Sequence, residues 1–250
     1  MSSFTDKHIV ITGGTKGIGF ATAERFARQG AKVLITGTSQ SSVDAALASS
    51  KESLQGTVCD LASMADIDAL AEKAGTELGR VDILFANAGL AHFQPLEKMT
   101  EALYDEMMDV NVKGLYFSIQ KLVPLMGEGG VIVVTASIAP RKGQAGMAVY
   151  GASKGAARGM VRSLAAELLE KGIRVNCISP GPVPTNIFSR MTGGDEAQSQ
   201  AIIDKLAESV PLGRVGKAEE MAAAVEFMCS DGAAYMIGSE LTLDGGKAEL

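Results

Sequence analysis

The sequence predicts an α/β fold in which one parallel sheet of about seven strands lies between two layers of helices. Short β-branched and apolar runs alternate along the whole chain with longer helical stretches, which is typical of successive β–α–β units. The first run, at residues 8–12, has a continuous β-branched centre, as expected for a strand buried on both faces. Because the 250 residues contain no internal repeat or low-complexity linker, we expect one domain over residues 1–250.

The apolar runs and the glycine and proline residues between them predict the order of elements. The expected strands are residues 8–12, 31–36, 55–58, 81–86, 131–135, 173–178 and 240–243. The expected helices are residues 20–29, 41–50, 64–78, 101–123, a stretch from about residue 148, and 218–230. Gly30, Gly79 and Pro124 end the first, third and fourth helices. Residues 186–210 are interpreted as a substrate lid, and a pair of surface helices is the alternative.

The composition argues against several classes of protein. Apolar residues make up 46% of the chain and charged residues 21%, which is enough apolar material for a globular core. The net charge is −6 without a basic run, so we expect neither nucleic acid nor a membrane as a partner. The three cysteines form no Cys-x-x-Cys pair, so neither a metal site nor a disulfide is predicted. With no apolar signal core and no run approaching ~20 apolar residues, we expect a soluble, cytoplasmic protein.

A glycine-rich turn joins the first strand to the first helix. Residues 12–19 read Thr-Gly-Gly-Thr-Lys-Gly-Ile-Gly. Glycines in such a turn let the backbone approach a pyrophosphate, whose charge lies at the helix N-terminus. The spacing is Gly-x-x-x-Gly-x-Gly, not the Gly-x-Gly-x-x-Gly of the best-known fingerprint, and a purely structural turn is the alternative. The context of strand, turn and helix predicts a dinucleotide across the carboxyl ends of the strands.

The residues after the second expected strand bear on the choice of dinucleotide. An acidic residue at this position binds the ribose hydroxyls of NAD, whereas a ribose phosphate requires neutral or basic surroundings. This chain has Gly37, Thr38 and Ser39 there and no carboxylate. Lys16, in the glycine turn, could pair with a 2′-phosphate, although it could equally be a solvated surface lysine. We therefore expect NADP(H) in preference to NAD(H).

Three further polar positions lie near the same edge of the predicted sheet. Asp60 follows the third strand and either accepts from an adenine amino group or caps a helix. Residues 87–89, Asn-Ala-Gly, follow the fourth strand, where small residues permit a close backbone approach. Asn111 and Gly114 lie inside an expected helix although both reduce helix propensity. A bend in the backbone and a functional role are both consistent with Asn111.

Tyr150 and Lys154 stand four residues apart, so on a helix both side chains share one face. A phenol has an ordinary pKa of about 10, and a neighbouring ammonium favours its ionised form. Such a tyrosine can exchange a proton with a substrate oxygen. The hydroxyl of Ser137, after the fifth strand, could hold the same oxygen. The alternative for this pair is a packed tyrosine beside an exposed lysine.

Taken together, these segments closely resemble the short-chain dehydrogenase/reductase family over essentially the full length. The matching segments are residues 12–19, 87–89, Asn111, Ser137, 150–154, 180–181, Thr185, 212–216 and 243–246. Ser137 precedes Tyr150 by thirteen residues, as the family pattern expects. One such motif is weak evidence, whereas an ordered series over 250 residues is strong.

The resemblance implies a Rossmann-type doubly wound sheet and a reversible, NADP(H)-dependent reduction of a ketone or aldehyde to an alcohol. Tyr150 would be the general acid in reduction and the base in oxidation. Lys154 would lower the pKa of that tyrosine and bind the nicotinamide ribose. Ser137 would orient the carbonyl, and Asn111 would hold a water that links Lys154 to solvent. We expect a homotetramer, with the helices after Asn111 and Tyr150 between subunits.

The resemblance also implies which residues line the cofactor and substrate sites. The expected cofactor-binding residues are Gly13, Thr15, Lys16, Gly17, Ile18, Gly19, Thr38, Ser39, Asp60, Leu61, Asn87, Ala88, Gly89, Tyr150, Lys154, Pro180, Gly181, Val183 and Thr185. The expected substrate-site residues are Leu90, Phe93, Ser137, Ile138, Met147, Tyr150, Ile187, Phe188 and Met191. His92 is interpreted as a polar residue at the rim of this site and not as a catalyst.

Three other functions remain open on the same residues. A reductase of 3-oxoacyl groups on an acyl carrier protein is less favoured, because residues 125–130 carry Glu128 where such enzymes tend to be basic. A silent dinucleotide sensor or scaffold would need only the glycine turn, yet Ser137, Tyr150 and Lys154 are all present. An epimerase or dehydratase usually carries a larger substrate domain. Ala86 replaces a second Asn that many relatives have before Asn87, which we expect to matter little.

Overall fold

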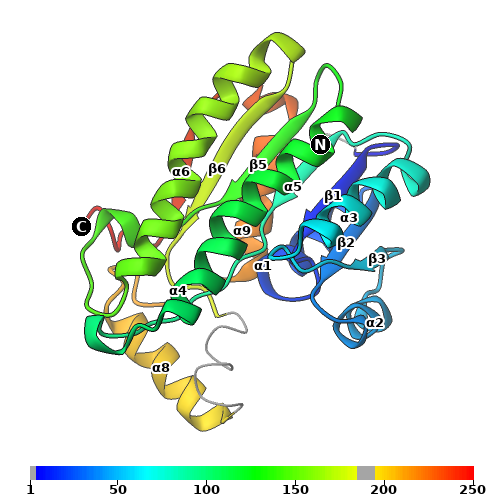
Figure 1. Cartoon of the computed structure of the whole chain (residues 1–250). Coiled ribbons are helices and arrows are strands. Elements are labelled where there is room, and N and C mark those ends of the chain that lie inside the picture. The colour runs from blue at the N-terminus through cyan, green and yellow to red at the C-terminus, as the bar shows by residue number, and fades with distance from the viewer. Residues whose placement is uncertain (1–3, 185–194) are drawn as a thin grey trace.

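Seven strands pair in parallel in the order β3-β2-β1-β4-β5-β6-β7, as the computed structural model shows (Figure 1). The structure describes residues 4–184 and 195–250 of the chain. The strands are β1 (His8–Thr12), β2 (Lys32–Gly37), β3 (Gln55–Val58), β4 (Ile83–Ala86), β5 (Val131–Thr135), β6 (Arg174–Pro180) and β7 (Glu240–Leu243). This sheet confirms the predicted fold class, and its strands lie within one or two residues of their expected bounds.

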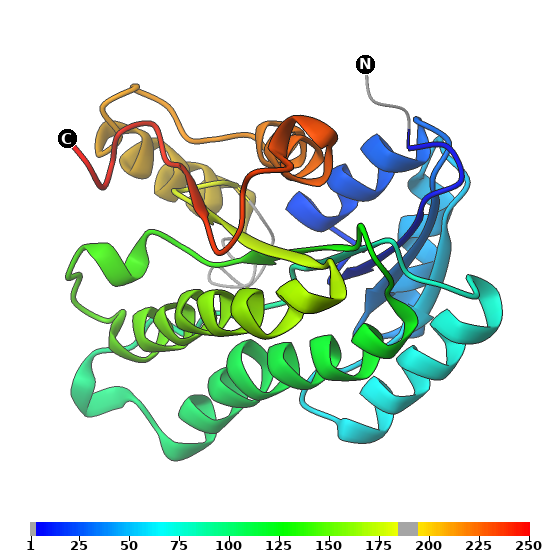
Figure 2. The same cartoon turned by 90° about the horizontal axis from the view of Figure 1, so that it is seen from above.

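The helices cover both faces of the sheet (Figure 2). The α-helices are α1 (Gly17–Ala27), α2 (Gln40–Ser49), α3 (Met64–Glu77), α4 (Glu101–Met108), α5 (Leu115–Leu122), α6 (Ala148–Leu168), α8 (Glu196–Glu208) and α9 (Ala218–Cys229). Short 3-10 turns are η1 (Leu96–Lys98), η3 (Val123–Leu125), η4 (Ala139–Arg141), η5 (Leu169–Lys171) and η6 (Asp231–Ala233), and η2 (Asp109–Gly114) is a π-helix.

Two apolar cores hold these layers together. On one face, Leu70 of α3, Ile119 of α5 and Val161 of α6 pack against the sheet in one buried cluster. On the other face, Phe26 of α1 and Val225 of α9 belong to a second buried cluster. Since both faces are covered, the strands need apolar side chains on both sides, which explains their continuous β-branched runs.

The strand order places a crevice at the carboxyl ends of β1 and β4. β1 pairs with β2 on one side and with β4 on the other, so the chain leaves β1 and returns on the opposite side of it. The loops that follow β1 and β4 therefore diverge, and ligands of open α/β sheets bind in the crevice between such loops. The glycine turn follows β1, and Asn87 follows β4.

The long expected helix 101–123 is interrupted by the π-helix η2, which separates α4 from α5. A Cβ on Gly114 would lie 2.3 Å from the carbonyl oxygen of Leu61, so only glycine permits this approach to the segment before α3. A π-helical turn accommodates one extra residue within a helix. Asn111 and Gly114, whose low helix propensity was noted above, therefore belong to a local departure from α-helical geometry.

Helix α8 forms part of the segment 186–210 that was interpreted as a lid, and none of its side chains is buried. The role of this segment as a lid stays a prediction. Within residues 4–184 and 195–250, no helix is long and apolar enough to cross a membrane. The same part of the chain holds no group of three or more His, Cys, Asp or Glu side chains arranged around a metal. All three cysteines are free and buried.

Candidate active site

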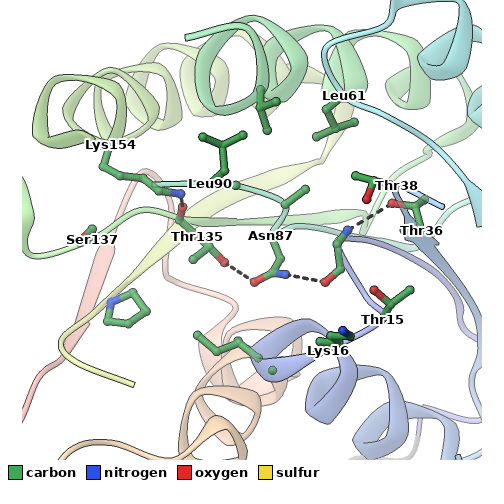
Figure 3. Close-up of a pocket in the computed structure, with 18 of the residues that line it drawn as sticks. Thr15, Lys16, Thr36, Thr38, Leu61, Asn87, Leu90, Thr135, Ser137 and Lys154 are labelled. Atoms are coloured by element: carbon green, nitrogen blue, oxygen red, sulfur yellow. Dashed lines mark hydrogen bonds between the residues drawn. The ribbon is translucent and has the colours of Figure 1, made fainter. Parts of the chain in front are cut away.

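A cavity of about 630 Å³ lies along the carboxyl ends of the strands (Figure 3). One part of its wall comes from the glycine turn and the start of α1, and another from the ends of β2, β3 and β4. Further parts of the wall are Ser137 after β5, Tyr150 and Lys154 on α6, the end of β6, and Glu106 and Val110 of α4 and η2. Segments distant in the sequence thus meet around one space.

The glycine turn is shaped by close backbone contacts. Gly13 and Gly17 have φ of +62° and +55°, in the left-handed region that favours glycine. A Cβ on Gly13 would lie 2.9 Å from Cα of Ala88, and one on Gly19 would lie 2.3 Å from the carbonyl oxygen of Gly13. Lys16 precedes α1 without forming a side-chain cap, so no side chain at that position accepts from the first turn. Helix N-terminal amides of this kind bind phosphate groups.

A continuous series of hydrogen bonds runs from Lys154 to the glycine turn (Figure 3). Lys154 Nζ donates to the carbonyl oxygen of Thr135 at 2.8 Å, and Thr135 Oγ1 donates to Asn87 Oδ1 at 3.1 Å. Asn87 Nδ2 donates to the carbonyl oxygen of Gly13 at 3.1 Å. The amide of Gly13 donates to Thr36 Oγ1 at 3.2 Å. These hydrogen bonds therefore fix the positions of the turn, β4, β5 and α6 relative to one another.

Ser137 and Tyr150 face each other at the other end of the cavity. The Ser137 side chain is buried and hydrogen-bonds to the Tyr150 phenol, while its Oγ accepts from the amide of Ala139 at 3.1 Å. Burial raises the pKa of Tyr150, and the hydrogen bond with Ser137 opposes that increase. Burial also lowers the pKa of Lys154 from 10.5 to about 8, because an ammonium without water around it is destabilised.

The raised pKa of Tyr150 differs from the lowering that the sequence analysis expected. The reason is that partial burial disfavours the phenolate more strongly than the hydrogen bond from Ser137 favours it. The Lys154 ammonium makes its hydrogen bond to Thr135 instead. A phenol in this state remains protonated at neutral pH and can act as a proton donor.

Asn111 is buried within η2 and holds the chain that follows β4. Its Oδ1 accepts from the amide of Leu90 at 2.9 Å. Its Nδ2 donates to the carbonyl oxygen of Leu90 at 2.8 Å and to Ser153 Oγ at 3.0 Å. A Cβ on Gly89 would lie 3.1 Å from both Asn111 Oδ1 and Lys154 Nζ, so these two groups flank the same glycine. The expected water between Asn111 and Lys154 stays a prediction.

Comparisons with known proteins agree with this geometry. A family model described as enoyl-(acyl carrier protein) reductase matches residues 13–248. Dehydrogenase/reductase SDR family member 4 of Oryctolagus cuniculus is 38% identical over 247 residues, covering 96% of this chain and 93% of its own. The chain belongs to the short-chain dehydrogenase/reductase family.

Solved structures place the same family on this fold. Levodione reductase superposes with a TM-score of 0.89 at 33% identity and covers 98% of both chains. A short-chain dehydrogenase of Burkholderia cenocepacia in complex with NADP superposes with a TM-score of 0.86 at 32% identity, covering 98% of this chain and 99% of its own. The chain is therefore an oxidoreductase of a family that uses nicotinamide dinucleotides.

The glycine turn fits such a cofactor, because Gly13 and Gly17 line the cavity and present backbone without a side chain there. The expected site residues that line the cavity are Gly13, Thr15, Lys16, Gly17, Ile18, Thr38, Asp60, Leu61, Asn87, Ala88, Gly89, Leu90, Ser137, Tyr150, Lys154, Pro180, Gly181 and Val183. Two expected residues that are absent from this lining contact residues that belong to it. Gly19 lies against the carbonyl oxygen of Gly13, and Asn111 accepts from the amide of Leu90. Ser39, which is also absent, caps α2 by accepting from the amide of Ser42. Thr185, Ile187, Phe188 and Met191 lie outside the described residues.

Asp60 lines the cavity and is not the cap of α3, since that position belongs to Ser63, whose hydroxyl accepts from the amide of Asp66. Of the expected substrate residues, Phe93, Ile138 and Met147 are absent from the cavity lining. Phe93 packs edge-on against Tyr150, with ring centroids 5.4 Å apart.

The sequence analysis missed three threonines at the carboxyl ends of strands. Thr12 Oγ1 accepts from the amides of Asn87 and Ala88, both at 3.1 Å. Thr36 and Thr135 form the hydrogen bonds described above. Each stands at or next to the last position of its strand, and this repeated position was the signal that could have identified them.

The rim of the site is polar on the side of α4. His92 Nε2 lies 2.8 Å from Glu106 Oε2, and Glu106 lines the cavity. The amide of Gln94 donates to the carbonyl oxygen of Gly146 at 3.0 Å, which ties the loop after β4 to the loop before α6. This placement is consistent with His92 as a rim residue.

Proposed function

We propose that this protein reduces a ketone or aldehyde to an alcohol with NADPH, and catalyses the reverse oxidation. The observation that carries the proposal is that Ser137, Tyr150 and Lys154 share one cavity with the glycine turn. The bound cofactor supplies a hydride to the carbonyl carbon. The protein positions that carbon and provides a proton for the oxygen.

Tyr150 donates its phenolic proton to the carbonyl oxygen as the hydride arrives at the carbon. Proton transfer at this point neutralises the charge that would otherwise develop on the oxygen. Ser137 holds the same oxygen by a hydrogen bond, and the Lys154 ammonium stabilises the phenolate that remains. In oxidation the phenolate is the base, so the raised pKa of Tyr150 favours reduction at neutral pH and oxidation at higher pH.

The preference for NADPH rests on charge at the end of β2. Gly37, Thr38 and Ser39 carry no carboxylate, and Lys16 lines the cavity together with Thr15 and Thr38. A 2′-phosphate would meet a cation and hydroxyls here without repulsion from an acidic side chain.

The test is the consumption of NADPH and of NADH with a panel of ketones, aldehydes, 3-oxoacyl thioesters and enoyl thioesters. We expect turnover of ketones or aldehydes, and a loss of kcat of about 10²- to 10⁴-fold in Tyr150→Phe. Tyr104→Phe is the matched control, because that ring is 45% exposed and outside the cavity. Equal rates in wild type and Tyr150→Phe would reject the mechanism. Turnover of thioesters alone favours an acyl reductase, and cofactor binding without any turnover favours a sensor.

We also propose that the protein acts on small molecules as a cytoplasmic homotetramer. A Cβ on Gly159 of α6 would meet no atom within 4 Å, so packing within the chain does not require glycine there. Tyr116 on the neighbouring helix α5 is 39% exposed. Light scattering after gel filtration should give the mass of four chains, and a mass of 25.9 kDa would contradict the proposal.

A further inference from the structure

Glu240 is a buried carboxylate that the reaction itself does not use. It begins β7, at the edge of the sheet, and pairs with Cys177 of β6 in the register of the two strands. Its side chain is only 9% exposed. A carboxylate at that depth is strongly destabilising unless charged and hydrogen-bonding partners surround it.

Three partners from three segments meet this carboxylate. Ser179 Oγ donates to Glu240 Oε1 at 2.6 Å. Arg141 Nη2 lies 3.0 Å from Glu240 Oε2, and Arg158 Nε forms an ion pair with the same oxygen. Both guanidinium groups are partly shielded from water, with side-chain exposures of 25% and 33%. Burial alone would raise the pKa of Glu240, but the hydrogen bond from Ser179 and the positive charges of Arg141 and Arg158 outweigh it and hold that pKa below its usual value.

Each of these partners belongs to a segment that carries part of the active site. Arg141 ends η4, which begins two residues after Ser137. Arg158 stands four residues after Lys154 and eight after Tyr150 on α6, so all three lie along one side of that helix. Ser179 immediately precedes Pro180 and Gly181, which line the cavity.

We propose that Glu240 is a positioning residue that fixes the Ser137 loop, helix α6 and the end of β6 relative to one another. The Ser137 hydroxyl must meet the Tyr150 phenol for both to reach one substrate oxygen. These two residues lie on segments that Glu240 joins through Arg141 and Arg158. Loss of the carboxylate removes the anion that Arg141 and Arg158 share. Arg141 then keeps only its ion pair with Glu249, and the repulsion between the two guanidinium groups separates η4 from α6. This role rests on the proposed function, and its test includes a measurement that needs no substrate.

The test compares Glu240→Gln with the matched control Glu226→Gln. Glu226 of α9 forms an ion pair with Arg25 of α1, away from the cavity, and its side chain is 20% exposed. Both variants should unfold at a lower temperature than wild type. We expect Glu240→Gln to lower kcat about tenfold or more while the substrate KM and the cofactor Kd change less than about threefold, since a displacement of about 1 Å at reacting groups can cost ~10²-fold. Glu226→Gln should keep the wild-type kcat.

The second measurement is the ¹³C NMR signal of the Tyr150 ring carbon that bears the hydroxyl, assigned by its loss in Tyr150→Phe. In Glu240→Gln this signal should move, because the hydrogen bond with Ser137 changes, and in Glu226→Gln it should stay. An unmoved signal in Glu240→Gln overturns the positioning role whether or not ketones are substrates. A wild-type kcat in Glu240→Gln also overturns it, whereas absence of turnover in wild type rejects only the proposed function. If Glu240→Gln does not fold, Arg141→Met, which removes the ion pairs of η4 with both Glu240 and Glu249, should move the same signal.

Discussion

The two ends of the cavity are built differently. The cofactor end is closed by backbone contacts and by the hydrogen bonds that run from Lys154 through Asn87 to Gly13. The proposed substrate end carries Ser137 and Tyr150, and Phe93 of the loop after β4 packs against the Tyr150 ring. The first arrangement suits a ligand that is the same throughout a family, and the second suits ligands that differ. Variants at each end should therefore fail in different ways.

The largest effect is expected at Lys154, where the two ends meet. Lys154→Met should reduce kcat about 10²-fold or more, since the phenolate loses its cation. Below pH 8 the same variant should have a larger free energy of unfolding than wild type, because a buried ammonium is removed. The difference between a pKa of 10.5 in the unfolded chain and about 8 in the fold corresponds to about 3 kcal/mol.

The sign of the pH dependence follows from that lowered pKa. Below pH 8 the lysine is charged in both states, and the full penalty of burial is present. Between pH 8 and 10.5 the unfolded chain binds more protons than the fold, so wild-type stability should rise relative to Lys154→Met. Urea unfolding of both proteins at pH 7 and pH 10 measures this. A constant difference between them would mean that Lys154 is not desolvated.

The cofactor end should not tolerate an added methyl group. Gly19→Ala places a Cβ 2.3 Å from the carbonyl oxygen of Gly13, and we expect a loss of about 1–3 kcal/mol in stability together with weaker cofactor binding. Gly127→Ala is the matched control, because a Cβ there meets no atom within 4 Å. Its stability should change by less than about 1 kcal/mol. Thermal unfolding measures the stability of the two variants, and fluorescence titration measures their Kd for NADPH. Equal stability and equal Kd in Gly19→Ala and Gly127→Ala would refute the close-packed turn.

Cofactor preference should respond to one side chain at the end of β2. Gly37 is unsuitable for an aspartate, because a Cβ there would lie 2.6 Å from Thr15 Cγ2 and 2.7 Å from Ser42 Oγ. Thr38 is exposed and lines the cavity. Thr38→Asp should lower the ratio of kcat/KM for NADPH over NADH by about tenfold or more through repulsion of the 2′-phosphate. Thr38→Asn is the control, because asparagine has the shape of aspartate without its charge. An unchanged ratio in Thr38→Asp would place the ribose phosphate elsewhere.

The smallest effect is expected at the substrate end. Phe93→Leu removes an edge-on ring contact with Tyr150, which is worth about 0.5–1.5 kcal/mol. KM for the ketone should rise a few-fold, and the extent should vary with the substrate, while the Kd of NADPH stays the same. A uniform loss of cofactor binding would show that the two ends are not separable.

Sequence patterns were sufficient for the sheet, and most of the residues expected to bind the cofactor line one cavity, while their contacts with it stay a prediction. β-branched runs identify strands buried on both faces, and the glycine turn has few other uses between a strand and a helix. The threonines at positions 12, 36 and 135 were missed because a threonine in a strand is usually explained by β propensity alone. The π-helix η2 was seen only as two poor helix formers, since the close approach of Gly114 to Leu61 joins residues far apart in the sequence.

The electrostatics of the site could not be read from residue spacing. The four-residue step from Tyr150 to Lys154 correctly placed both on α6, where they line one cavity. Spacing does not report burial, and burial determines the direction of the pKa of Tyr150. The role of Glu240 was likewise hidden, because its partners Arg141, Arg158 and Ser179 come together only when β7 joins the sheet.

The most direct test of the central claim follows a labelled hydride. Wild-type protein and Tyr150→Phe are each given NADPH that carries deuterium in place of both hydrogens at C4 of nicotinamide, with a ketone that the wild type reduces. We expect one deuterium on the carbinol carbon of the wild-type product and almost no product from Tyr150→Phe, although both proteins bind NADPH with similar Kd. Product without deuterium at that carbon, or equal product from both proteins, would contradict the account.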